Sequence, residues 1–211
     1  MRANLDRDQI IEKLSSDLRS GRRVSDHRFD QLYSPSIRRL SRVHWTPVEV
    51  AIRAAELLAQ KENDRILDVG SGCGKFCLVA ALTVHTHFIG VEEREDLHKA
   101  AQFALEDLKA TRATFIHRNM TDVNFGDYTG FYIFNPFYEN VEKSIRIDAK
   151  VSHHSDKFYG YIETLRKKLD LMPSGTRVVT YHGFGGNLPD SYEQVSKEPI
   201  GTSVVELWVK R

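Results

Sequence analysis

The sequence RILDVGSGCGKF, from Arg65 to Phe76, decides the fold. A short apolar strand at 66–69 leads directly into a glycine-rich turn at 70–74, and a helical pattern begins at Lys75. Glycines at such a junction let the backbone turn tightly and approach a ligand closely, because no Cβ stands in the way. The start of the next helix offers backbone N–H groups that have no partner inside the helix. The stretch therefore predicts a strand, turn and helix that together bind a polar ligand.

A second apolar run, at 88–91, ends in Glu92, which follows Gly72 by 20 residues. An acid at the end of a second parallel strand is placed to accept hydrogen bonds from both ribose hydroxyls of a nucleoside. Dinucleotide-binding turns follow the pattern G-x-G-x-x-G or G-x-G-x-x-A, which would require a small residue at position 75. This chain has Lys75 there. The layout therefore favours a nucleoside cofactor that is not a dinucleotide.

The spacing G-x-G-x-G after Leu67 and Asp68 resembles motif I of the class I S-adenosylmethionine-dependent methyltransferases. The resemblance runs from about Ile66 to Phe137, which is about a third of the chain. It implies that S-adenosylmethionine is the cofactor. The residues that it assigns to the amino-acid and ribose parts of the cofactor are Asp68, Gly70, Ser71, Gly72 and Glu92.

A polar segment at 119–122 follows a predicted strand at 114–117. In the methyltransferases, an acid after the third strand accepts a hydrogen bond from the adenine amine, which can only donate. The resemblance therefore assigns this role to Asp122, with Met120 packed on the adenine ring and Thr121 beside them. The alternative is an acid in a solvated loop.

The tetrad at 135–138, Asn-Pro-Phe-Tyr, follows an apolar run at 131–134 of the kind that forms a central strand buried on both faces. It resembles the (Asp/Asn/Ser)-Pro-Pro-(Tyr/Phe) motif of amino-group methyltransferases, in which the first side chain and the first proline carbonyl accept hydrogen bonds from the target NH₂. The resemblance implies catalytic roles for Asn135, Pro136 and Tyr138, with Asn135 also beside the cofactor. Phe137 replaces the second proline, as aromatics do in some protein-methylating relatives, including lysine enzymes. A plain turn is the alternative.

Strand and helix patterns alternate along the chain, which is typical of an α/β fold. With the resemblance, they predict a Rossmann-like, mostly parallel seven-stranded sheet with helices on both faces. Strands are expected at 65–69, 87–92, 114–117, 131–134, 177–181, 192–196 and 203–209, the last two as an antiparallel pair, and helices at 75–83, at 95–108 and from Ser155.

Residues 1–45 are predicted to form an N-terminal helical extension, and residues 46–211 the cofactor-binding domain. Thr46, Pro47 and Glu49 match a helix start in which Thr46 is the N-cap and Glu49 completes a capping box. The resemblance places the segment 44–46 near the cofactor, although a purely structural cap explains the same residues.

The net charge of the whole chain is +1, so no global field draws it to nucleic acid or membranes. The extension holds ten Lys or Arg and six Asp or Glu, a balance of +4, against −3 for the rest. Such an arm can bind RNA, although a solvated helical face explains the same excess. The chain shows no apolar run of membrane-spanning length and no signal-peptide pattern, so we expect a cytoplasmic protein without a membrane partner.

No metal site is expected, because two cysteines one helical turn apart, Cys73 and Cys77, make no zinc site and the histidines lack ligand spacing. His182, at the end of a predicted strand, is placed to line a substrate cleft. The sequence as a whole predicts an S-adenosylmethionine-dependent methyltransferase that acts on a nitrogen of protein or RNA. Two alternatives stay open: a catalytically inactive cofactor-binding subunit or sensor, and a nucleic-acid-binding module. A small amine is also open as the acceptor.

Overall fold

A seven-stranded sheet forms the centre of the protein, in a computed structural model that describes residues 2–134, 155–183 and 185–211. The strand order is β3-β2-β1-β4-β5-β7-β6. The first five strands in this order are parallel, and β7 runs antiparallel to both of its neighbours. This confirms the predicted Rossmann-like sheet. The strands are β1 (Arg65–Val69), β2 (His87–Glu92), β3 (Ala113–His117), β4 (Gly130–Ile133), β5 (Arg177–Tyr181), β6 (Tyr192–Ile200) and β7 (Ser203–Lys210).

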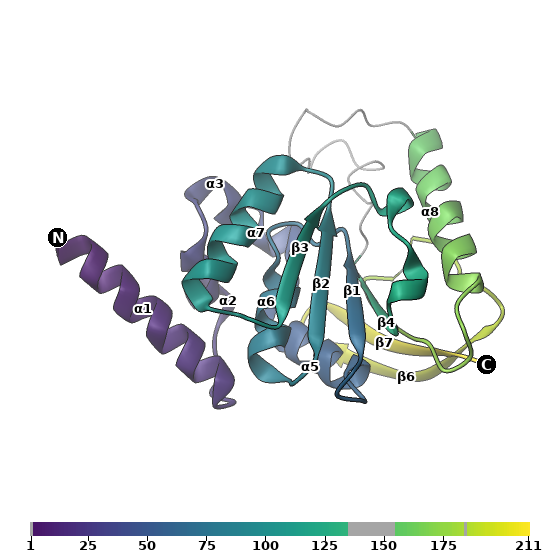
Figure 1. Cartoon of the computed structure of the whole chain (residues 1–211), viewed down its shortest axis with the longest axis horizontal. Helices are drawn as coiled ribbons and strands as arrows, with labels where there is room; N and C mark the ends of the chain where they lie inside the picture. The colour runs from purple at the N-terminus through teal and green to yellow at the C-terminus, as the bar shows by residue number, and fades with distance from the viewer. Residues whose placement is uncertain (1, 135–154, 184) are drawn as a thin grey trace.

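Helices cover both faces of the sheet (Figure 1). One face carries α5 (Val48–Leu58), α6 (Lys75–Thr83) and α7 (Glu95–Leu108), whose apolar residues share a core with the sheet. The other face carries α8 (Ser155–Asp170) and two short 3₁₀ turns, η2 (Met120–Asp122) and η3 (Phe125–Asp127), over a second core. The helix α6 is buried along nearly its whole length because α5, α7 and the N-terminal helices surround it.

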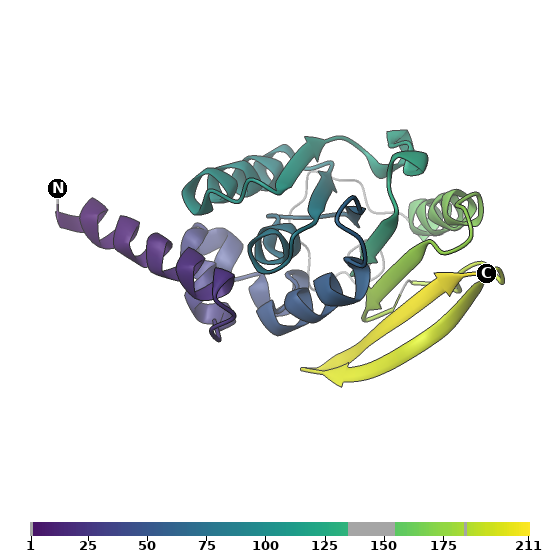
Figure 2. The same cartoon turned by 60° about the horizontal axis from the view of Figure 1, so that its bottom comes forward.

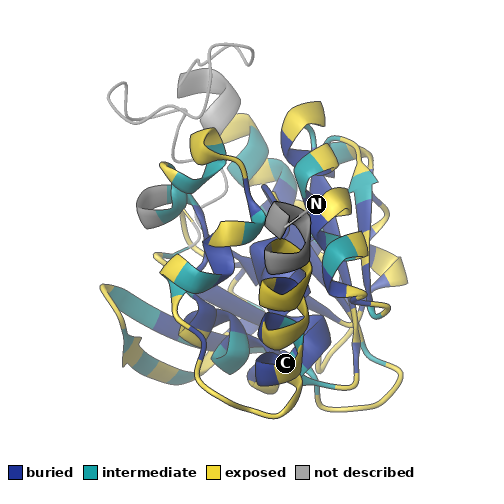
Figure 3. Cartoon of the chain, turned by 90° about the vertical axis from the view of Figure 1, so that its left-hand side faces the viewer, coloured by how far each residue is buried: buried dark blue, intermediate teal, exposed yellow. Residues whose placement is uncertain are grey.

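Five elements precede α5: the long helix α1 (Arg2–Arg19) and the short elements α2 (Asp26–Phe29), η1 (Asp30–Leu32), α3 (Pro35–Arg38) and α4 (Ser41–His44). The first half of α1 projects from the body, while its second half lies against α6 and α7 (Figures 1 and 2). Figure 3 shows the same helix from its exposed side, with the buried residues gathered behind it. Leu14 and Leu18 are almost fully buried there and belong to the same core as α6.

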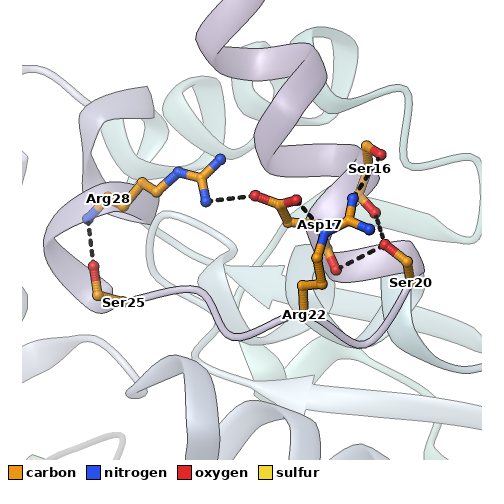
Figure 4. A network of polar contacts seen from close by, with 6 residues as sticks. All are labelled: Ser16, Asp17, Ser20, Arg22, Ser25 and Arg28. Carbon is orange, nitrogen blue, oxygen red and sulfur yellow. Dashed lines mark hydrogen bonds and ion pairs between the residues drawn. The ribbon is translucent and has the colours of Figure 1, made fainter.

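A polar network closes the turn between α1 and α2 (Figure 4). The carboxylate of Asp17 is buried and accepts hydrogen bonds from Arg22, at 2.6 Å, and from Arg28, at 2.5 Å. The Ser25 side chain caps α2 by accepting a hydrogen bond from the Arg28 N–H. These contacts fix the direction in which the chain leaves α1.

The predicted cap of α5 is wrong. The helix begins at Val48 with Pro47 in the N-cap position, and the Thr46 hydroxyl instead lies 3.0 Å from the Tyr132 hydroxyl. The Val48 N–H donates to the carboxylate of Asp26 at 2.8 Å. A charged acceptor from the extension therefore replaces the local cap.

Most predicted elements have the observed bounds, and four strands differ. β3 begins one residue earlier than expected, β4 spans 130–133 and excludes Phe134, β6 continues to Ile200, and β7 continues to Lys210. The longer β6 follows from its pairing with β7, which continues to the end of the hairpin. Within the described residues, no helix is long and apolar enough to cross a membrane.

We predict that α1 stabilises the whole domain. Leu14→Ala should lower the free energy of unfolding by about 2–5 kcal/mol, since it removes a buried side chain from the shared core. Ile10→Ala, on the same helix but 48% exposed, should change it by less than about 0.5 kcal/mol. Urea unfolding followed by circular dichroism measures both. A Leu14→Ala variant that unfolds like the wild type would show that α1 contributes nothing to the core.

Candidate cofactor site

The glycine-rich turn folds back over the end of β2. The N–H groups of Gly70 and Ser71 both donate to the backbone oxygen of Val91, at 3.1 and 2.9 Å. Gly72 has a φ of 55°, and a Cβ at this position would lie 2.6 Å from the ring of Trp45. Gly74 has a φ of 81°, and its Cβ would lie 2.4 Å from the ring of Phe115. Both positions therefore require glycine, for conformation and for space.

Glu92 holds this turn in place. One of its carboxylate oxygens accepts a hydrogen bond from the Gly72 N–H at 2.9 Å, and the other accepts one from the Arg94 N–H at 2.8 Å. Burial raises the pKa of Glu92, while these N–H groups and the Arg94 guanidinium, 3.8 Å away, oppose the rise. Each carboxylate oxygen has a second lone pair, so Glu92 keeps acceptor capacity for a ligand.

Asp68 lies beneath the turn at the end of β1 and is only 4% exposed. The thiol of Cys77 donates to its carboxyl group at 3.6 Å. Burial raises the pKa of Asp68 to about 8, with a smaller contribution from the charge of Glu92. The neutral acid therefore predominates at pH 7.

A small cavity opens beside the turn, at the carboxyl edge of β1 and β4. The hydroxyl of Ser71 is buried and has no hydrogen-bond partner among the described residues, so it is available to a ligand. The lining residues are His44, Trp45, Thr46, Asp68, Gly70, Ser71, Lys75, Phe76 and Phe134.

The segment after β3 forms the 3₁₀ turn η2, which Asn119 caps. Met120 is buried in the core beneath α8, and Asp122 is exposed. The Thr121 hydroxyl donates to the Asn119 side chain at 2.8 Å. The Asn119 amide in turn donates to the Glu93 carboxylate at 2.7 Å and to the Tyr161 hydroxyl at 3.0 Å.

The contact between Asn119 and Glu93 joins the ends of β2 and β3, and the sequence reasoning missed it. The sequence feature that could have indicated it is Glu93, a second acid directly after Glu92 at the end of a predicted strand. The adenine contacts of Met120, Thr121 and Asp122 stay a prediction.

The predicted catalytic residues Asn135, Pro136 and Tyr138 lie outside the described residues. Phe134 directly precedes them, and its ring centroid lies 5.3 Å from that of Tyr181 and 5.6 Å from that of His182. His182 has a φ of 58°, which is uncommon for a residue other than glycine, and burial lowers its pKa. The ends of β4 and β5 therefore meet at one edge, with His182 beside the position from which the tetrad begins.

Several solved structures have the same fold as this protein. An RNA methyltransferase from Salinibacter ruber, solved in complex with S-adenosyl-L-homocysteine, is 21% identical, with a TM-score of 0.55 over 78% of this chain and 92% of that one. TrmN from Thermus thermophilus is 16% identical, with a TM-score of 0.60 over 87% of this chain and 53% of that one. The fold is that of S-adenosylmethionine-dependent methyltransferases. The putative methyltransferase yhhF from Escherichia coli shares this fold at 15% identity, with a TM-score of 0.56 over 77% and 85% of the two chains.

The methyltransferase fold also has support from sequence. Residues 42–142, slightly less than half of the chain, match the family model of protein-L-isoaspartate(D-aspartate) O-methyltransferases. A search of curated proteins returns no match. The family match and the shared fold support an S-adenosylmethionine-dependent methyltransferase whose cofactor is S-adenosylmethionine.

The chemistry of the site residues fits such a cofactor. The Glu92 carboxylate is an acceptor of the kind that ribose hydroxyls need, and the Ser71 hydroxyl lies in the polar cavity at the adjoining strand end. The ribose contact itself stays a prediction. The turn that separates them has no room for side chains at Gly72 or Gly74.

We predict that Asp68 makes the cofactor-free protein less stable as the pH rises. Its folded-state pKa of about 8 lies above the ordinary value of 3.8, so between these values the folded state keeps a proton that the unfolded chain loses. The free energy of unfolding then falls as the pH rises through this window. Asp68→Asn should reduce that fall, by on the order of 1.4 kcal/mol for each pH unit of the window. Urea unfolding from pH 4 to 8 measures it, and parallel profiles for the two proteins would contradict it.

Proposed function

We propose that this protein transfers a methyl group from S-adenosylmethionine to a nitrogen atom of RNA or protein, with RNA as the favoured acceptor. The observation that carries the proposal is the hydrogen bond between the Glu92 carboxylate and the Gly72 N–H. This bond brings the ribose-binding acid and the glycine turn into one site at the carboxyl edge of the sheet, where ligands bind in open α/β folds.

The acceptor side of the site is proposed to be the tetrad after β4. S-adenosylmethionine supplies a methyl carbon on a positively charged sulfur, which is already electrophilic. The protein therefore has mainly to orient the lone pair of the acceptor and to exclude water. The Asn135 side chain and the Pro136 carbonyl are acceptors suited to an NH₂ group, and Tyr138 is suited to shaping the pocket. Phe134, which directly precedes them, lines the cavity beside Ser71.

The distribution of charge in the N-terminal extension supports an anionic acceptor. Two of its six acids, Asp26 and Asp30, form salt bridges with Lys75, which lies outside the extension, and Asp30 is buried. Arg23 and Arg39, in contrast, are exposed. The surface of the extension is therefore more basic than the residue count indicates, which suits a polyphosphate backbone. Protein is the second candidate, because the matched family is described by a protein substrate, although its description names transfer to oxygen rather than to nitrogen.

A methyl-transfer screen with labelled S-adenosylmethionine tests the function. We expect incorporation into RNA that exceeds incorporation into protein extract and small amines, and a decrease with increasing salt as phosphate contacts are screened. Tight cofactor binding without transfer to any acceptor would favour the inactive subunit. RNA binding without cofactor binding would favour the nucleic-acid module.

In the same screen, Asn135→Ala should reduce turnover roughly 10²-fold, because a positioning contact to the acceptor is lost. The affinity for S-adenosylhomocysteine should stay close to that of the wild type. Full turnover in this variant on the best acceptor would show that Asn135 is a turn residue. The assignment would then move to His182, to Trp45 or to Glu139, the acid that follows Tyr138 in the sequence.

We predict that Glu92→Ala weakens the binding of S-adenosylhomocysteine by about 1–3 kcal/mol, because the ribose hydroxyls lose their acceptor and Gly72 loses its hydrogen bond. The matched control is Glu95→Ala, which removes a nearby acid that is 61% exposed and paired only with Lys99 among the described contacts. Isothermal titration calorimetry should give wild-type affinity for the control. Equal affinities for both variants, or tight binding of NAD by the wild type, would count against the assigned cofactor.

A further inference from the structure

We propose that residues 26–46 form a wall of the cofactor pocket and that Lys75 is the positioning residue that holds this wall against the glycine turn. Cofactor binding and docking of the segment are then coupled. This inference rests on the proposed function, since it assumes that the pocket accepts S-adenosylmethionine. The sequence resemblance places only the segment 44–46 near the cofactor, and the inference adds the contacts of residues 26–41 that hold this segment in place.

Lys75 is the first residue of α6 and follows the glycine turn directly. Its side chain is only 2% exposed, yet its ammonium group lies 2.7 Å from a carboxylate oxygen of Asp30 and 2.7 Å from one of Asp26. An isolated buried charge is strongly unfavourable, and a paired one much less so. Asp26 is in α2 and Asp30 is in η1. Because the buried Lys75 ammonium group would be unpaired without them, these two ion pairs favour the position in which α2 and η1 lie against α6.

The same two acids hold both ends of the segment that reaches the pocket. Asp30 accepts a hydrogen bond from the Ser41 hydroxyl with its other oxygen, which anchors α4. Asp26 accepts the Val48 N–H at 2.8 Å, which anchors the start of α5. The chain between these anchors contains His44, Trp45 and Thr46, all of which line the cavity.

Trp45 connects this segment to the glycine turn. Its indole N–H donates to the backbone oxygen of Ile37 at 2.9 Å, and its ring occupies the space where a Cβ of residue 72 would be. The contacts thus run from Lys75 through Asp30 and Ser41 to Trp45 and back to Gly72. If the segment leaves, the cavity loses one wall and the turn loses its cover. A ligand that needs both therefore stabilises the docked state, and docking strengthens binding by the same factor.

The Asp17 network provides a matched control within the same extension (Figure 4). Its carboxylate is also buried and also bound by two cations, Arg22 and Arg28. None of these three residues lines the cavity beside Ser71. Loss of the Asp17 network removes one contact of α2, through Arg28, but leaves the contacts of Asp26 and Asp30 with Lys75 in place.

The first experiment compares Lys75→Met with Asp17→Asn by calorimetric titration of S-adenosylhomocysteine. We expect Lys75→Met to weaken binding about 10-fold or more, within the usual range for coupled sites, and Asp17→Asn to change it less than about 2-fold. Similar affinities for Lys75→Met and the wild type would overturn the proposal, as would an equal loss in both variants.

The second experiment uses the unaltered protein and so holds even if Lys75→Met fails to fold. Saturating S-adenosylhomocysteine should slow backbone hydrogen exchange in residues 26–46 by about 5-fold or more, while residues 8–18 of α1 change little. Unchanged exchange in 26–46 despite measured binding would overturn the coupling alone. Failure of the wild type to bind S-adenosylhomocysteine at all would overturn the proposed function and this inference together.

Discussion

The hydrogen bond from the Gly72 N–H to the Glu92 carboxylate depends on the register of the two central strands. β1 and β2 are parallel with Val69 opposite Val91, so the turn after β1 lies directly beside the acid that ends β2. Gly90 in β2 leaves room for the turn to lie there, because a Cβ at this position would be 2.6 Å from the Ser71 hydroxyl oxygen. The strand register, the glycine turn and the position of Glu92 therefore depend on one another. A shift of β2 by one residue would move Glu92 away from Gly72 and turn the Glu92 side chain to the other face of the sheet.

Two different electrostatic environments meet across this turn. On the sheet side, Asp68 and Glu92 are buried close enough for one charge to raise the pKa of the other group, and burial raises both. On the helix side, Lys75 lies between Asp26 and Asp30. The carboxyl groups of Asp68 and Glu92 have oxygen lone pairs left that could accept hydrogen bonds from a ligand. The charges of Lys75, Asp26 and Asp30, in contrast, are paired within the protein. Among the described contacts, Lys75 forms its ion pairs with Asp26 and Asp30 and not with Asp68 or Glu92.

The sequence predicted the elements whose signals are local. The bounds of β1, β2, α6 and α7 follow from short apolar runs and helical spacing, and the structure confirms them. The failures involve partners far along the chain. Thr46 is not the cap of α5 because Asp26, which lies 22 residues before Val48, binds the Val48 N–H. The sequence pattern used Lys75 only to exclude a dinucleotide, since its burial becomes visible only when the acids of α2 and η1 are in place. The roles of Asn135 and Asp122 rest on resemblance and stay predictions.

The N-terminal extension packs on the sheet domain with one face and exposes basic side chains on the other. Its apolar residues, including Leu14, Phe29 and Trp45, share one core with the helices of the sheet domain. The acids Asp26 and Asp30 pair with Lys75, while Arg23 and Arg39 are exposed. Acids that pair with a lysine outside the extension no longer offset its exposed arginines, so the same contacts that build a wall for the cofactor leave the outer surface basic. A segment that covers the cofactor pocket on one side and attracts phosphate on the other would bring an RNA acceptor to the edge of the sheet where the methyl group is expected.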